Sequence, residues 1–214
     1  DWAVELPFSP DASHSHGYKT IGWKYPENSI GWYRKTIFIP VSDLGRKISV
    51  QFDGIHRNSM VWVNGFYLGT EHSGYTGFEY DISDYLNYGG NNVIAVRADA
   101  SIEEGWYYEG AGIYRHCWLN KTSKLHVKSN GTFVTTEFGT KSARLTVRTT
   151  LVNQLGTTTA FTIEQSLFDA QGRKVSYNSS ASNSLEPMSE KNCFSGLYVE
   201  NPTLWDLQNP YLYK

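Results

Sequence analysis

Four carboxylates stand close together in the middle of the chain, at Asp99, Glu103, Glu104 and Glu109. Two carboxylates about 5–5.5 Å apart across a glycosidic bond are the machinery of a retaining glycosidase. A run of acidic residues around a glycine is more often a solvated loop in which one or two side chains make structural hydrogen bonds. For catalysis we favour the solvated loop, and we predict that this chain contains no catalytic residue.

A second cluster has the spacing of metal ligands, because His14 and His16 lie near Asp11. Histidines at i and i+2 share a face only on a strand, whereas this Ser/Asp/Gly-rich stretch is typical of a loop. A metal site also needs a third or fourth ligand of defined geometry. We therefore predict no metal site and no cofactor. The isolated His56, His72 and His116 are expected to be structural.

Composition limits the classes of protein that the sequence can encode. The chain has 214 residues, of which 40% are hydrophobic and 15% aromatic, enough for two domains with real cores. Its formal net charge is −2 and no Lys/Arg block occurs that could bind a phosphate backbone. We therefore expect no nucleic-acid partner. The apolar runs are strand-sized, so no segment is expected to span a membrane.

Period-two alternation of apolar and polar residues dominates the first half of the chain and predicts strands. The pair Asn64-Gly65 stands between two apolar runs, which is a strong hairpin signal because a type I′ turn needs φ > 0 at both central residues. Further strands are expected at residues 32–39, 48–52, 77–81, 93–98 and 112–119. Residues 83–86 are predicted to form one helical turn. The Gly-Gly-Asn-Asn stretch at residues 89–92 is predicted to interrupt regular secondary structure.

The composition changes at a polar joint near residues 120–124, after which the strands become rich in Thr and Ser. Strands are predicted at residues 144–151, 161–168 and 193–199, with a turn at residues 169–172. This rhythm is typical of an immunoglobulin-like sandwich. Tyr211-Leu212-Tyr213 is expected to open a strand that the chain does not complete.

Seven blocks, in order along nearly the whole chain, resemble glycoside hydrolase family 2, whose members include β-galactosidases, β-mannosidases and β-glucuronidases. The most specific block is residues 106–115, Trp-Tyr-Tyr-Glu-Gly-Ala-Gly-Ile-Tyr-Arg. The other six blocks, in chain order, are Gly31-Trp32-Tyr33-Arg34-Lys35-Thr36, Phe52-Asp53-Gly54-Ile55, Val61-Trp62-Val63-Asn64-Gly65, Gly74-Tyr75-Thr76-Gly77-Phe78, Asn201-Pro202-Thr203-Leu204-Trp205 and Asn209-Pro210-Tyr211-Leu212-Tyr213.

The resemblance implies an all-β chain: a jelly-roll, galactose-binding-like β-sandwich at residues 1–122, then an immunoglobulin-like β-sandwich at residues 123–214, expected to be truncated at its C-terminal end. In the family, a TIM barrel that carries both catalytic glutamates follows these domains. No βα alternation resembling that barrel is present, so we expect this chain to be inactive alone. Its expected partners are the missing barrel and, through the full-length enzyme, a β-galactoside-like carbohydrate. A homo-oligomer is compatible with the sequence.

The resemblance also implies a binding role for one segment, because a carboxylate loop of the family's jelly roll reaches into the mouth of the barrel. Glu103, Glu104, Trp106 and Tyr107 occupy that place and are the predicted substrate-binding residues. Carboxylates accept hydrogen bonds from sugar hydroxyls, and a flat ring can cover the C–H face of a pyranose.

Two residues near the motifs receive a structural interpretation. Arg115 is predicted to be buried and paired with a carboxylate such as Asp53 or Asp81, because a buried charge needs a partner. Trp62, in the middle of the hairpin, is predicted to be part of the core.

We therefore interpret the chain as the non-catalytic portion of a family 2 glycoside hydrolase, of the retaining β-galactosidase type, acting on terminal β-glycosides. The alternatives are a free-standing carbohydrate-binding module, which would bind sugar alone, and a structural interaction domain. Cys117 and Cys193 fall in different predicted domains, so two free thiols are expected. The compartment stays open, with a periplasmic or extracellular location slightly favoured over the cytoplasm.

Overall fold

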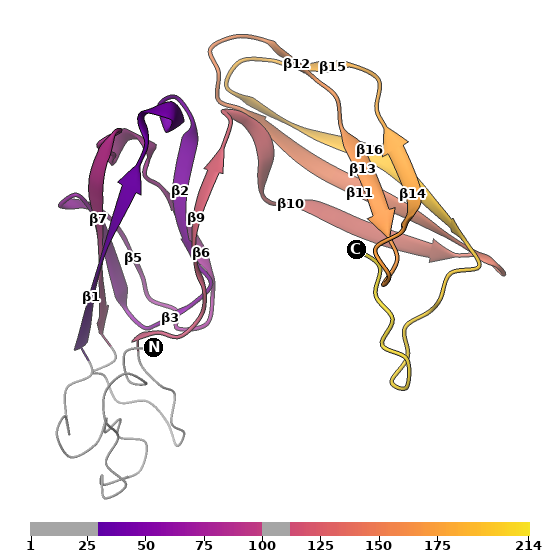
Figure 1. Cartoon of the computed structure of the whole chain (residues 1–214), viewed down its shortest axis with the longest axis horizontal. Helices are drawn as coiled ribbons and strands as arrows, with labels where there is room; N and C mark the ends of the chain where they lie inside the picture. Colours follow the sequence, from indigo (N-terminus) through magenta and orange to yellow (C-terminus); the bar gives the residue numbers. More distant parts are fainter. Residues whose placement is uncertain (1–29, 100–111) are drawn as a thin grey trace, which may run out of the picture. The chain divides into compact units, whose positions relative to one another are not determined.

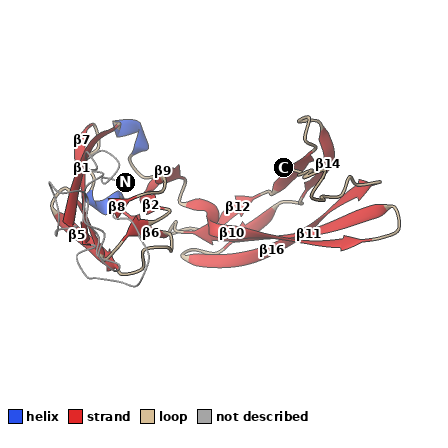
Figure 2. Cartoon of the chain, turned by 90° about the horizontal axis from the view of Figure 1, so that it is seen from below, coloured by secondary structure: helices blue, strands red, loops and turns tan. Residues whose placement is uncertain are grey.

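The structure is a computed structural model that describes residues 30–99 and 112–214. The chain forms two compact units that divide between Thr122 and Ser123, and each is described by itself. Strands make up nearly all the regular structure, with two short helical turns in the first unit, at Val41–Asp43 and Ser83–Tyr85 (Figure 2). The all-β prediction is confirmed, and among the described residues no helix is long and apolar enough to cross a membrane.

The first unit contains two main antiparallel sheets, one with the strand order β1-β7-β4-β5 and one with the order β6-β2-β9 (Figure 1). A two-stranded pair, β3-β8, lies beside them. The strands are β1 Ile30–Ile39, β2 Lys47–Phe52, β3 Ile55–His56, β4 Ser59–Val63, β5 Phe66–Glu71, β6 Phe78–Asp81, β7 Gly90–Asp99, β8 Gly112–Ile113 and β9 Cys117–Thr122.

The core of the first unit lies between the two main sheets. It is built from alternate residues of their strands, among them Ile39, Val50, Val61 and Val96, which are at most 3% exposed. Burial of such side chains contributes about 1.5–3 kcal/mol each to folding. The alternation that predicts these strands therefore follows directly from the need to bury one face of each sheet.

The hairpin β4–β5 turns through Asn64 and Gly65, whose φ angles are 50° and 89°. Both central residues have positive φ, which confirms the predicted turn. The helical turn at Ser83–Tyr85 is also confirmed. The predicted breaker at residues 89–92 is shorter than expected: Gly89 lies in a turn with a φ of 81°, but β7 already begins at Gly90. Asn92 belongs to this strand and its side chain is fully buried, where it bonds the neighbouring turn.

Two further corrections concern the first unit. The predicted strand at residues 112–119 is split into β8 and β9, so that each part pairs with a different strand. Trp62 is not part of the core: its neighbours Val61 and Val63 are fully buried, whereas the Trp62 ring lies on the opposite, outer face. An alternating pattern fixes which residues share a face but leaves open which face is buried when both carry apolar side chains.

The second unit contains a three-stranded antiparallel sheet, β10-β11-β16, and the two-stranded pairs β12-β15 and β13-β14 (Figure 1). Its core includes Val147, Leu167, Leu197 and Val199. The strands are β10 Leu125–Phe138, β11 Ser142–Asn153, β12 Thr159–Phe161, β13 Glu164–Phe168, β14 Lys174–Ser179, β15 Asn183–Leu185 and β16 Ser189–Glu200.

Two expectations for the second unit need correction. The strand predicted at residues 161–168 is two strands, β12 and β13, which pair with different partners. No strand is assigned at residues 211–213. Tyr213 instead packs against the core, and Lys214 exchanges two backbone hydrogen bonds with Phe168, of 2.7 and 2.9 Å. The turn at residues 169–172 is present, with Gly172 at φ 78°.

Candidate functional site

The four predicted substrate-binding residues, Glu103, Glu104, Trp106 and Tyr107, lie outside the described residues, as do Glu109, His14 and His16. The structure does describe both ends of the segment that carries the first four. That segment leaves β7 after Asp99 and returns at Gly112, the first residue of β8. The described part of the candidate site is therefore the framework around Asp99 and Gly112.

One end of the segment is anchored to the turn that follows β3, and the other end pairs with β3 itself. The Asp99 backbone N–H donates to the carbonyl of Arg57 at 2.8 Å, and the Asn58 side-chain amide donates to the Asp99 carbonyl at 3.4 Å. Gly112 pairs with His56 in the β3-β8 ladder. The Asp99 carboxylate is itself bound by Arg97 at 2.7 Å. The segment thus starts and ends at fixed positions.

The chain at residues 72–77 packs against the same framework. His56 is 1% exposed, and its ring meets the edge of Tyr75 at a centroid distance of 5.6 Å. Gly74 lies so close to the His56 ring that a Cβ on Gly74 would sit 2.3 Å from Cδ2. Glycine is thus required here by close approach, which explains its place in the Gly-Tyr-Thr-Gly motif.

The residues that close the most specific motif hold these parts together. The Tyr114 phenol donates to the Gly74 carbonyl at 2.9 Å, and the Arg115 guanidinium donates to the carbonyls of Tyr75 at 3.2 Å and Asp53 at 3.4 Å. The predicted buried ion pair of Arg115 is therefore wrong: Arg115 is exposed and bonds backbone carbonyls. The exposed position needs no carboxylate partner, since water solvates the rest of the guanidinium.

An aromatic and carboxylate cluster continues the framework along β9. The Trp118 indole N–H donates to Asp53 Oδ2 at 2.8 Å, and the Gln51 amide donates to Asp53 Oδ1 at 3.1 Å. The His116 ring stacks on Trp118 at 5.3 Å, with an angle of 28° between the planes. Asp53 is thus held as a hydrogen-bond acceptor between fixed donors. Among the described residues, no group of three or more His, Cys, Asp or Glu side chains is placed to hold a metal ion.

The motifs are visible in the sequence, but the way in which they meet is visible only in the structure. Residues from the Phe52-Asp53-Gly54-Ile55, Gly74–Phe78 and Gly112–Arg115 parts of the motifs bond one another and pack around His56, and Asp99 bonds the carbonyl of the adjacent Arg57. We call this group, Asp53, His56, Gly74, Asp99, Tyr114 and Arg115, the rim. The rim offers backbone and side-chain hydrogen-bonding groups and aromatic rings, which suit recognition of a hydroxyl-rich ligand.

The two cysteines are free thiols, as predicted. Cys117 lies on β9 and Cys193 on β16, in different units. Burial raises the pKa of the Cys117 thiol, and the nearby Asp53 carboxylate raises it further. A thiol in this state is a weak nucleophile at neutral pH, so we assign it no chemical role.

The described residues form a tandem of two β-sandwich units. Residues 22–123 match the family described as "Glycosyl hydrolases family 2, sugar binding domain", and residues 125–214 match "Glycosyl hydrolases family 2". The chain therefore belongs to glycoside hydrolase family 2. The predicted resemblance is confirmed, and with it the jelly-roll and immunoglobulin-like sandwiches.

Similar proteins share this domain pair. The beta-galactosidase BoGH2A of Bacteroides ovatus is 41% identical over 215 residues, covering 100% of this chain and 25% of the relative. A beta-glucuronidase of Formosa agariphila is 30% identical, covering 86% of this chain and 21% of the relative. A solved family 2 glycosyl hydrolase from Bacteroides cellulosilyticus superposes with a TM-score of 0.86 at 35% identity, covering 97% of this chain and 26% of that chain. This chain thus spans about a quarter of the length of these relatives.

Proposed function

We propose that this chain is the non-catalytic N-terminal portion of a retaining β-galactosidase of family 2, which cleaves terminal β-glycosides. In this proposal residues 1–122 are the sugar-binding jelly roll and residues 123–214 the immunoglobulin-like domain. The higher identity to the beta-galactosidase BoGH2A, 41% against 30% for the beta-glucuronidase of Formosa agariphila, supports the galactoside over the glucuronide.

The contribution of the chain is to support and partly line the glycone site. Glu103 and Glu104 would accept hydrogen bonds from sugar hydroxyls, each worth about 1.5–3 kcal/mol when the acceptor is charged. Trp106 and Tyr107 would cover a pyranose face. The observation that carries this proposal is the rim, because it fixes the two ends of the segment that bears all four residues.

The acid and the nucleophile of the reaction are expected in a barrel domain that this chain does not resemble. The two carboxylates at the rim each have a structural donor, Trp118 for Asp53 and Arg97 for Asp99. Both carboxylates are thus committed to structural contacts among the described residues.

The experiment compares residues 1–214 with the full-length enzyme on nitrophenyl β-galactoside, β-mannoside and β-glucuronide. We expect no turnover by residues 1–214, and by the full-length enzyme the highest kcat/KM on the galactoside. Turnover by residues 1–214 after rigorous purification would overturn the non-catalytic assignment. A higher kcat/KM on the glucuronide would overturn the choice of substrate while leaving the architecture in place.

A further inference from the structure

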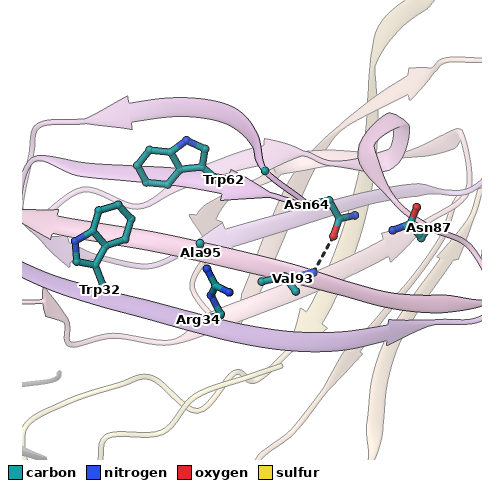
Figure 3. Close-up of a pocket in the computed structure, with 8 residues that line it drawn as sticks. Trp32, Arg34, Trp62, Asn64, Asn87, Val93 and Ala95 are labelled. Carbon is teal, nitrogen blue, oxygen red and sulfur yellow. Dashed lines mark hydrogen bonds between the residues drawn. The ribbon is translucent and has the colours of Figure 1, made fainter.

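A row of aromatic rings crosses the outer face of the β1-β7-β4-β5 sheet. The Trp32 and Trp62 rings stack with their centroids 5.5 Å apart and 28° between their planes, and Tyr67 continues the row 5.7 Å from Trp62. Trp32 is 65% and Tyr67 55% exposed. Figure 3 shows the two tryptophans above the strands that carry Arg34 and Ala95. Large exposed aromatic rings gathered on one face mark a binding surface.

The small side chain of Ala95 leaves space on this face between Trp62 and Arg34, whereas Arg97 lies opposite Trp32. Trp32 lies on β1 and Trp62 on β4, and β7 runs between these two strands. The register places Ala95 directly opposite both Arg34 and Trp62. Strands in a sheet are about 4.8 Å apart, so the two rings must lean over β7 to come into contact. A larger side chain at position 95 would crowd the Trp62 ring and fill the pocket between Trp62 and Arg34.

The rings form one side of an open pocket of about 530 Å³, lined by Trp32, Arg34, Trp62, Asn64, Gly65, Asn87, Val93 and Ala95. The far end of the pocket is fixed by Asn64. The Asn64 amide donates to the Tyr85 carbonyl and to Asn92 Oδ1, both at 2.7 Å, and its carbonyl oxygen accepts the Val93 N–H at 2.9 Å (Figure 3). Asn64 is therefore a structural part of the pocket.

Two polar side chains beside the rings are uncommitted. Within residues 30–99 and 112–214, neither the Arg34 guanidinium nor the Asn87 side-chain amide has a hydrogen-bond or ion-pair partner, and both are exposed. Arg97, the nearest cation on this face by register, is already paired with Asp99. Arg34 thus contributes an uncompensated positive charge next to the aromatic row.

We propose that this pocket binds an oligosaccharide that carries a carboxylate, such as a chain containing uronic acid residues. The polarised C–H groups of a pyranose face are attracted to the negative face of an indole ring. The planar guanidinium of Arg34 pairs with a carboxylate through two parallel hydrogen bonds, and the Asn87 amide bonds a neighbouring hydroxyl. The site goes beyond the proposed function, because none of its residues belongs to the rim or to residues 103–107.

The test is titration calorimetry of residues 1–214 with two β-linked oligosaccharides of equal length, one of glucuronic acid units and one of glucose units. We expect the acidic chain to bind at least tenfold more tightly. Trp32→Ala and Ala95→Leu should each weaken binding of the acidic chain at least tenfold. Arg34→Gln should remove the preference for the acidic chain and leave binding of the neutral chain unchanged. Trp205→Ala, which removes an exposed ring of the second unit, is the matched control and should bind as the wild type does.

Each contrary result overturns the proposal. Absence of binding by the wild-type chain, with its melting transition intact, excludes a sugar site on this face. Equal affinity for the two oligosaccharides, or a preference that survives Arg34→Gln, excludes the assigned role of the guanidinium. Light scattering that shows a dimer dissociated by Trp32→Ala, without sugar binding, would assign the face to a second copy of the chain. These results are separate from the activity tests of the proposed function, which use the full-length enzyme.

Discussion

Tyr114 and Gly74, 40 residues apart in the sequence, are joined by a hydrogen bond of 2.9 Å from the Tyr114 phenol to the Gly74 backbone carbonyl. The bond connects the end of the most specific family motif to the chain at residues 72–77. That chain also receives Arg115 at the Tyr75 carbonyl and packs Gly74 on the buried His56. The two motifs therefore act as one framework within the first unit.

Removal of this bond should weaken the first unit measurably. Tyr114→Phe keeps the ring but leaves the Gly74 carbonyl without its donor, so we expect the free energy of unfolding to fall by about 0.5–1.5 kcal/mol. Urea unfolding of residues 1–214 measures this difference. Tyr177→Phe is the matched control, since Tyr177 is 50% exposed and its ring contacts Lys174 without a hydrogen bond from the phenol. Equal losses in the two variants would show that the Tyr114 bond contributes nothing.

Asn92→Ala should be among the most destabilising single changes in the first unit. Asn92 is fully buried, and its Oδ1 accepts from Asn64 at 2.7 Å and from the Asn87 N–H at 2.6 Å. Its Nδ2 donates to the carbonyls of Asn87 and Gly90, both at 3.1 Å. Each buried polar group left without a partner costs about 1–3 kcal/mol, so we expect a loss of at least about 2 kcal/mol.

The control for this change is the neighbouring residue. Asn91→Ala alters an exposed side chain on the same strand and should change the free energy of unfolding by less than about 0.5 kcal/mol. Thermal or urea unfolding of both variants gives the comparison. A small effect of Asn92→Ala would mean that water replaces the lost bonds and that the pocket end is not rigidly held.

The second unit should lose stability in acid through Asp169. Burial alone raises the pKa of this carboxyl, but hydrogen bonds from the backbone and side chain of Arg173, its positive charge and the Gln171 N–H outweigh burial and lower the pKa. The carboxylate therefore contributes stability that is present above its ordinary pKa of about 3.9 and is lost as the pH falls through the lower, folded-state pKa.

The measurement is urea unfolding of residues 1–214 between neutral pH and about pH 3, followed by a probe of the second unit. Asp169→Asn should be less stable than the wild type at neutral pH, and the difference should shrink as the wild-type carboxylate protonates. A difference that stays constant over the whole range would show that the charge of Asp169 contributes no pH-dependent stability.

Local chemistry explains the parts of the fold that could be predicted from the sequence. The strands follow from period-two alternation, and the hairpin follows from Asn64 and Gly65, which adopt positive φ at low cost. The burial of Trp62 and the position of Asn92 in a strand were predicted incorrectly, because both depend on contacts with other strands or turns. Whether an indole lies inside or outside depends on which face the second sheet covers. An Asn can continue a strand when the preceding turn and a residue of another strand satisfy its amide, as Asn87 and Asn64 do for Asn92.

The candidate site could be predicted in its motifs but not in its geometry. The family blocks identified Gly74 and Tyr114, yet only long-range pairing brings them together. The Trp32–Trp62 pair is absent from the sequence prediction, because the two rings meet across β7 and their contact depends on strand order.

The central claim, that residues 103–107 contribute to the glycone site, is tested most directly by steady-state kinetics of Glu104→Ala and Trp106→Ala in the full-length enzyme. Contacts present in both the ground and the transition state affect KM more than kcat. We therefore expect KM for the β-galactoside to rise about tenfold or more in each variant, with kcat changed less than KM. Glu104→Gln and Trp106→Phe should recover part of the affinity, and Glu200→Ala, an exposed carboxylate of the second unit, should have no effect. If folded Glu104→Ala and Trp106→Ala enzymes both keep the wild-type KM and kcat, the account is contradicted and the segment is scaffold only.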